Sequence, residues 1–176
     1  MASPNLISQR VDAITGIPAK ARIDNPPCPR SVKIELTARC NFNCAFCATG
    51  ERLRDKRDMN IDFYGRLLDD LKQSGVEEVG MFYLGESFLL PWLPKAIRMA
   101  KDRGFSYVFC TTNGSLATPK MIEECMRAGL DSLKFSINWS DETQFKEVAR
   151  VKPELFWGAI NNIKAAKKIR DSVFKD

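Results

Sequence analysis

The chain has 176 residues, of which 44% are hydrophobic and 28% are charged, and its formal net charge is +5. This length and apolar content fit one globular domain with its own core, and no apolar run approaches the roughly 20 residues that a membrane-spanning helix needs. The net charge is mild, so it does not by itself indicate a nucleic-acid partner.

Residues 1–30 predict an irregular N-terminal lead-in, and residues 31–176 predict the core domain. Pro26, Pro27 and Pro29 disfavour regular structure in the lead-in. Residues 1–16 contain no apolar run of the kind found in secretory signal peptides. We therefore expect a cytoplasmic protein, in which cysteines stay reduced and a cluster of them indicates metal binding.

Three closely spaced cysteines follow the first strand-like segment. Cys40, Cys44 and Cys47 have C-x3-C-x2-C spacing in the run TARCNFNCAFCATG. A [4Fe–4S] cluster normally takes four cysteine ligands, so three thiolates would hold three irons and leave one iron open to a ligand that is not protein. The pattern therefore predicts chemistry on a bound molecule.

Two other interpretations of these cysteines are a zinc site and disulfide bonds. A structural zinc site needs a fourth Cys or a His, but the chain has no histidine, and Cys28, Cys110 and Cys125 lie at irregular distances. Six cysteines could pair by count, but disulfide frameworks belong to small secreted chains. The three remote cysteines are interpreted most simply as small apolar core or loop residues.

The segment from Lys33 to Cys47, KIELTARCNFNCAFC, resembles the signature of the radical S-adenosylmethionine (SAM) superfamily. In that family the signature lies in a loop after the first strand of a partial (β/α)6 barrel. The resemblance implies that Cys40, Cys44 and Cys47 bind the cluster and that the amino and carboxylate groups of SAM chelate the open iron. It also implies that Phe46 lies against the adenine.

Beyond the cysteines the sequence predicts a loop and then a helix. Basic and acidic residues alternate over residues 51–58, which is typical of a solvated loop rather than a nucleic-acid surface. Asn60 predicts an N-cap, the apolar positions from Ile61 to Leu71 predict one buried helix face, and Gly75 predicts the end of that helix.

The second strand-like run, Glu78 to Tyr83, is followed by Leu84, Gly85 and Glu86. This element is similar to the family's Gly-Gly-Glu at the end of its second strand, with Leu84 in place of the first glycine. A glycine at this point would let the backbone approach a ligand closely. By the resemblance, Glu86 would accept charge-assisted hydrogen bonds from the SAM ammonium group.

The third run, Tyr107 to Thr111, leads into Thr112-Asn113-Gly114, which is similar to a Thr-Asn-Gly element at the same barrel position in many family members. The resemblance implies that Asn113 contributes to the SAM site. Asn-Gly is also a common turn dipeptide, so a plain turn is the alternative. Helices are predicted up to Gly104 and from Thr118-Pro119 to Gly129.

The fourth run, Asp131 to Ile137, resembles a family strand that usually ends Ser-x-Asp-Gly. Ser136 and Asn138 would then face the SAM carboxylate or ribose. Asn138 replaces the expected aspartate and Trp139 the expected glycine, so hydrogen bonding is retained while a charge is lost. A long helix is predicted from Pro153 to about residue 174.

Four alternations of strand and helix predict an α/β fold, a partial TIM-like barrel of the radical SAM type with only about four βα units in this chain. All the motifs fall at the carboxyl ends of strands, where sites in such sheets lie. A core of this family has six βα units. We therefore expect a longer protein or another chain to supply the missing strands.

The resemblance implies a radical SAM enzyme. A reduced cluster passes one electron to the sulfonium of SAM, and the resulting 5′-deoxyadenosyl radical abstracts hydrogen from a substrate. The electron would come from a donor such as flavodoxin or ferredoxin. No general base is needed, which agrees with a chain that has no histidine.

The substrate is left open by the sequence. The motif series is more similar to the branch that modifies peptides and proteins, whereas Cys47 to Gly50 is also similar to RNA-methylating members. Members that act on small molecules share the same core. A further alternative is an iron–sulfur electron carrier or cluster-binding module without SAM chemistry.

Overall fold

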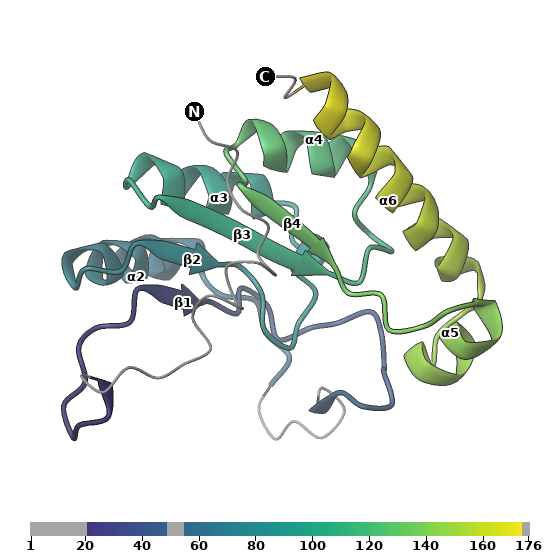
Figure 1. The fold of residues 1–176 in the computed structure, drawn as a ribbon, viewed down its shortest axis with the longest axis horizontal. Coiled ribbons are helices and arrows are strands. Elements are labelled where there is room, and N and C mark those ends of the chain that lie inside the picture. The colour runs from purple at the N-terminus through teal and green to yellow at the C-terminus, as the bar shows by residue number, and fades with distance from the viewer. Residues whose placement is uncertain (1–20, 49–54, 174–176) are drawn as a thin grey trace.

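The computed structural model describes residues 21–48 and 55–173. Four parallel strands form one sheet in the order β1-β2-β3-β4. The strands are β1 (Ser31–Lys33), β2 (Glu78–Gly80), β3 (Tyr107–Thr112) and β4 (Ser132–Phe135). Figure 1 shows them side by side, with each strand next to the one that precedes it in the chain. The predicted α/β fold with four βα units is confirmed.

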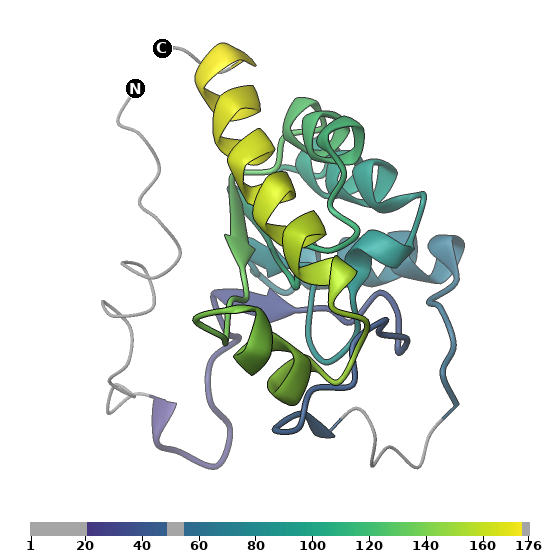
Figure 2. The ribbon, with the colours of Figure 1, turned by 90° about the vertical axis from the view of Figure 1, so that its right-hand side faces the viewer.

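Helices connect the strands and cover the sheet. They are α2 (Ile61–Gln73), α3 (Leu93–Asp102), α4 (Pro119–Arg127), α5 (Glu142–Ala149) and α6 (Glu154–Val173), with a short 3-10 helix, η3 (Ser87–Leu89), after β2. Contacts run from α2 to α3, from α3 to α4 and from α4 to α6. Figure 2 shows α2, α3 and α4 on the same side of the sheet. None of the helices in the described ranges combines the length and apolar character required to span a bilayer.

The main core lies between the sheet and this row of helices. Side chains with no exposed surface come from a strand and from three helices: Val108, Leu68, Ile97 and Ile122. Burying each such side chain stabilises the fold by about 1.5–3 kcal/mol. Cys110 and Cys125 lie in the same core, as expected for small apolar residues.

The predicted helix ends are confirmed at the level of hydrogen bonds. Asn60 accepts from the backbone N–H groups of Asp62 and Phe63, both at 2.9 Å. Thr118 accepts from Met121 N at 3.3 Å. The glycines expected after the helices have positive φ angles: Gly75, Gly104 and Gly129.

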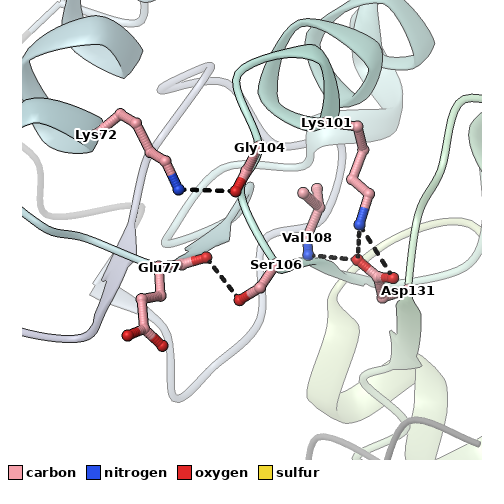
Figure 3. Close-up of polar contacts among 7 residues, drawn as sticks. All are labelled: Lys72, Glu77, Lys101, Gly104, Ser106, Val108 and Asp131. Carbon is pink, nitrogen blue, oxygen red and sulfur yellow. Dashed lines mark hydrogen bonds and ion pairs between the residues drawn. The ribbon is translucent and has the colours of Figure 1, made fainter.

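Polar contacts fix the loops at the amino ends of the strands (Figure 3). The Asp131 carboxylate accepts from Lys101 Nζ at 3.0 Å and from Val108 N at 2.7 Å, which ties β4 to α3 and β3. Ser106 Oγ donates to the Glu77 carbonyl at 3.1 Å. These polar groups at the amino ends of the strands are therefore occupied by contacts within the fold.

Two strands are shorter than predicted. β2 ends at Gly80 rather than Tyr83, because the next carbonyl, of Met81, accepts from the Ser87 hydroxyl at 2.6 Å outside the ladder. β4 ends at Phe135 rather than Ile137, because Ile137 N turns back to the Phe135 carbonyl at 3.1 Å. Residues 1–20 of the predicted lead-in and residues 49–54 of the predicted charged loop lie outside the described residues.

Helix α5 was not predicted. Asp141 caps it by accepting from Gln144 N at 2.9 Å, and Arg150 ends it with a φ of 53°. An aspartate followed three residues later by glutamine is a capping-box signal, so the sequence did carry an indication of this start. A second hydrophobic cluster joins α5 to the start of α6 and to Phe42.

Candidate functional site

The three cysteines lie on one segment, which we call the cysteine loop (residues 37–48), between β1 and α2. Cys40, Cys44 and Cys47 form no disulfide bond, and each is partly exposed. Cys47 N donates to the Cys44 carbonyl at 3.0 Å, which makes a tight turn around Ala45 and Phe46. This arrangement leaves three thiols accessible to a ligand.

The protonation of these thiols reflects their surroundings. Burial, together with the neighbouring Cys40 and Cys47, raises the pKa of Cys44 to about 11. Burial also raises the pKa of Cys40, while the hydrogen bond from Phe42 N, at 3.5 Å, and the nearby Asn113 side chain favour its thiolate. Metal ions displace such protons and supply the positive charge that favours thiolates.

The spacing of the three thiols distinguishes a site for a single metal ion from a site for a cluster. In the described part of the chain, no three His, Cys, Asp or Glu side chains converge closely enough to hold one metal ion. In a cubane each cysteine binds a different iron, so its three sulfurs do not have to converge on a point. The donor set of three partly exposed thiols fits a cluster.

Several hydrogen bonds join the start of the cysteine loop to the segment that precedes α2. Arg39 donates to Asp58 through Nε at 2.8 Å and Nη2 at 2.6 Å, and Thr37 Oγ1 donates to the same carboxylate at 2.7 Å. Ala38 N donates to the Arg57 carbonyl at 2.9 Å. The start of the cysteine loop is therefore held against the segment that precedes α2.

Gly85 lies against the backbone at the start of the cysteine loop. A Cβ atom at Gly85 would come within 1.9 Å of the Thr37 carbonyl oxygen and 2.9 Å of the Arg39 carbonyl oxygen. The backbone N–H groups of Leu84 and Gly85 both donate to Glu35 Oε1 at 3.1 Å. Only glycine allows this approach, and what it approaches is the start of the cysteine loop.

Glu86 is 2% exposed, and its carboxylate and backbone N–H together join three segments. It accepts from Thr112 Oγ1 at 2.9 Å, from Asn113 N at 2.8 Å and from Phe88 N at 3.0 Å. Its own N–H donates to the Arg39 carbonyl at 2.8 Å. Burial raises its pKa, and the three hydrogen bonds oppose that rise. All the donors described here are neutral.

The turn after β3 contacts the cysteine loop directly. Asn113 Nδ2 donates to Asn41 Oδ1 at 2.9 Å, Asn41 Nδ2 donates to Ser115 Oγ at 2.8 Å, and Ser115 Oγ donates to Asn113 Oδ1 at 2.8 Å. We call these three side chains the amide ring. The ring places the Thr-Asn-Gly turn beside Cys40.

A family model of the radical SAM superfamily matches residues 34–174, a range that contains the cysteine loop, Glu86 and the turn after β3. The chain belongs to the radical SAM superfamily. The family implies a [4Fe–4S] cluster and SAM as cofactors, together with a source of electrons, and the predicted fold and cofactors are confirmed at this level.

Radical SAM relatives differ in what their names describe. The chain is 32% identical over 108 residues to a tungsten-containing aldehyde ferredoxin oxidoreductase cofactor-modifying protein of Pyrococcus furiosus, covering 60% of this chain and 30% of that protein. It is 29% identical over 120 residues to a GTP 3′,8-cyclase of Chlorobaculum tepidum, covering 68% of this chain and 36% of that protein. The chain thus spans about a third of the length of these curated relatives.

A solved structure shares the fold. The structure of anSMEcpe with bound AdoMet and the Cp18Cys peptide superposes with a TM-score of 0.62 and 15% identity, covering 81% of this chain and 41% of that chain. At this identity the likeness concerns the fold alone. The names of the relatives do not single out one branch of the superfamily.

The other predicted SAM-binding residues lie around the cysteine loop or on the turn after β4. Phe46 is 64% exposed between two of the cysteines. Ser136 is partly exposed and follows β4, where its N–H donates to the Thr112 carbonyl at 2.8 Å. Asn138 is exposed and donates from Nδ2 to Ser136 Oγ at 3.3 Å. Their roles toward SAM remain predictions.

Sequence reasoning missed the residues that support the cysteine loop through partners far away along the chain. Glu35, Asn41 and Asp58 are the main examples, and each acts on a partner brought close by the fold. Glu35 and Asn41 lie inside the segment that resembles the family signature, but nothing in their spacing indicates those partners.

Proposed function

We propose that this chain is the cluster- and SAM-binding core of a radical SAM enzyme. The observation that carries the proposal is the set of three partly exposed cysteine side chains, none in a disulfide, on one loop that Gly85 and Glu86 contact at the carboxyl ends of the strands. When bound, a reduced cluster and SAM supply one-electron cleavage of the sulfonium to give a 5′-deoxyadenosyl radical. The chain's own residues bind and orient these cofactors.

Each site residue has a role consistent with its position. Cys40, Cys44 and Cys47 would hold the cluster. Glu86 would accept a hydrogen bond from the SAM ammonium, which would favour its ionised form despite burial. Gly85 would keep the backbone beside Glu86 close to the loop.

The remaining side chains would contact other parts of SAM. The exposed ring of Phe46 would cover the adenine, since an apolar ring gains by losing contact with water. Ser136 and Asn138 would donate to the carboxylate or ribose, and Asn113 would contribute to the same SAM site.

A peptide or protein segment is the substrate that we propose. The motif series along the strands, which is more similar to the peptide- and protein-modifying branch, supports it. The relatedness to a GTP cyclase favours a small molecule as the second candidate. We also propose flavodoxin or ferredoxin as the electron donor.

SAM cleavage tests the proposal directly. The purified chain is reconstituted with iron and sulfide without oxygen, reduced with dithionite and incubated with SAM. We expect 5′-deoxyadenosine from the wild type and none from Cys44→Ala. A reduced cluster that yields no 5′-deoxyadenosine would instead identify an electron carrier or a cluster-binding module.

The substrate class is tested by stimulation of the same reaction. Peptide mixtures and GTP are added separately, and the rate of 5′-deoxyadenosine formation is compared with the rate without substrate. Faster formation with peptides supports a peptide or protein substrate. Faster formation with GTP supports the small-molecule alternative.

A further inference from the structure

Trp139 carries a polar atom that the fold does not use. Its side chain is 8% exposed, and its indole N–H has no hydrogen-bond partner among the described residues. This N–H is the one polar group of the side chain, and it can only donate. A buried donor without an acceptor is unfavourable, and in a native structure such a group calls for an explanation.

Trp139 lies at the carboxyl end of the sheet, in the turn between β4 and α5. The same turn holds Ser136 and Asn138, the two residues proposed to donate to SAM. Ser136 N donates to the Thr112 carbonyl at 2.8 Å, which fixes the start of the turn beside β3. The unused donor is therefore on the residue that directly follows the proposed SAM-binding residues.

Aromatic contacts hold the Trp139 ring against the cysteine loop. The ring centroids of Trp139 and Phe42 are 6.2 Å apart, and Phe42 lies between Cys40 and Cys44 in the chain. Trp139 also packs edge-on against Phe145 of α5, with centroids 4.7 Å apart. Both cysteines pack against this same hydrophobic cluster. Trp139 thus joins the turn after β4 to the loop that carries the proposed ligands of the iron–sulfur cluster.

The cysteine sulfurs do not satisfy this donor. Cys40 Sγ accepts from Phe42 N at 3.5 Å, whereas the Trp139 N–H bonds to neither Cys40 nor Cys44. SAM, which the family implies as a cofactor, carries several acceptors in its carboxylate, ribose and adenine groups. A bound SAM molecule could therefore supply the acceptor that Trp139 lacks within the described fold.

We propose that Trp139 is a SAM-binding residue of this chain, whose indole N–H donates to an acceptor atom of the bound cofactor. A donor that is unpaired in the free protein gains more from a ligand than one that must first give up a bond to water. The inference rests on the proposed function, because it requires that SAM binds at the carboxyl ends of the strands.

The test compares the SAM affinity of the wild type and Trp139→Phe, measured by calorimetric titration of reconstituted protein with an oxidised cluster, so that SAM is not cleaved. Phenylalanine keeps an aromatic ring at this position but has no N–H. We expect the affinity to fall about fivefold to hundredfold at unchanged iron content. Site-specific 3-benzothienylalanine at position 139, which has sulfur in place of the N–H and keeps the full ring size, should give the same loss.

Phe145→Leu is the matched control, because it loosens the packing around Trp139 and Phe42 without removing a side-chain donor. We expect wild-type SAM affinity from this variant. Unchanged affinity in Trp139→Phe, or an equal loss in Phe145→Leu, would overturn the inference. A shifted reduction potential in Trp139→Phe at unchanged SAM affinity would also overturn it and make the iron–sulfur cluster the acceptor.

These outcomes are separable from failure of the proposed function. If the wild type binds no iron–sulfur cluster or no SAM, the proposed function fails. If the wild type binds SAM and both replacements of Trp139 bind it equally well, only the inference fails. Iron content and thermal unfolding of each variant show whether a loss of affinity reflects loss of the iron–sulfur cluster or of the fold.

Discussion

At the scale of residues, the site depends on buried polar groups that each satisfy several partners. Glu86 serves three donors while its backbone N–H holds the start of the cysteine loop. A buried group that loses its partner costs about 1–3 kcal/mol. Single substitutions here should therefore affect both the fold and the chemistry, and controls must separate the two.

The first prediction concerns the metal. Protein purified without oxygen should contain about four iron and four sulfide ions, and replacing Cys40, Cys44 or Cys47 with alanine should abolish them, as measured by iron and sulfide analysis. Matched alanine variants of the remaining cysteines should retain the iron: Cys28, Cys110 and Cys125. Equal loss from all six variants, or zinc at full occupancy, would contradict the cluster.

The second prediction concerns Glu86. Glu86→Gln removes the charge that would face an ammonium group and places an NH2 group among donors such as Asn113 N. A charge-assisted hydrogen bond is worth about 1.5–3 kcal/mol, so SAM affinity should fall about tenfold to hundredfold at unchanged iron content. Calorimetric titration measures the affinity.

Asn138→Ala is the milder comparison, since its side chain is exposed and bonds only to Ser136 in the described residues. It should reduce SAM affinity less than Glu86→Gln. If Glu86→Gln bound SAM as tightly as the wild type, SAM would have to lie elsewhere.

Some residues of the candidate site could be predicted from the sequence, whereas their contacts across the fold could not. Cys40, Cys44 and Cys47 were predicted as cluster ligands from their spacing, and Glu86 was predicted as a SAM ligand from its resemblance to the family element after the second strand. Gly85 was found for the same reason, but the neighbour it approaches is the Thr37 backbone. Contacts of that kind depend on packing between strands and leave no trace in local spacing.

At the scale of elements, α5 braces the cysteine loop. Asn43 N donates to the Ala149 carbonyl at 3.1 Å, and Ala45 N donates to the Val148 carbonyl at 2.8 Å. The last carbonyls of a helix lack partners within it, so the loop satisfies them. Phe42 also packs on Phe145 of α5, with ring centroids 5.6 Å apart.

The third prediction follows from this contact. Asp141→Ala removes the N-cap of α5, which costs about 0.5–2 kcal/mol, and α5 has only 8 residues to offset it. The amides of Asn43 and Ala45 should then exchange with deuterium faster, and the cluster should be lost faster to a chelator. Asn60→Ala is the matched control, because it removes the N-cap of α2 at a similar cost.

With Asn60→Ala we expect wild-type exchange at Asn43 and Ala45. Unaltered exchange in Asp141→Ala would show that the loop keeps its shape without α5. The sequence did not predict this helix because its apolar pattern is short, with only Phe145 and Ala149 buried. Longer helices such as α2 were predicted because more of their positions repeat the helical period.

At the scale of the whole molecule, the sheet has one end for stability and one for function. Contacts such as Asp131 with Lys101 occupy the amino ends (Figure 3), whereas the cysteine loop, Glu86 and the amide ring gather at the carboxyl ends. This division is typical of parallel βα folds. The parallel βα arrangement was predictable from the alternation of strands and helices. The hydrogen bonds that join the cysteine loop to Glu86 and to the turn after β3 were not.

The last prediction concerns β4 (Ser132–Phe135), which pairs with β3 on one side and with no other strand in the described residues. An edge strand exposes unpaired backbone groups that favour association with other chains. We propose that further strands, from a longer protein or another chain, pair with this edge. The 176-residue chain alone should therefore associate as its concentration rises, and β4 amides should exchange faster than β3 amides.

Light scattering over a concentration series and hydrogen exchange resolved by residue measure both effects. The β3 amides are the internal control, because β3 lies between β2 and β4 and its burial does not depend on the free edge. A chain that stays monomeric and protects β4 as strongly as β3 would mean that the edge is closed within the chain. Protection that appears only at high concentration would instead indicate pairing between copies, since a row of unpaired N–H and C=O groups is satisfied when another strand arrives.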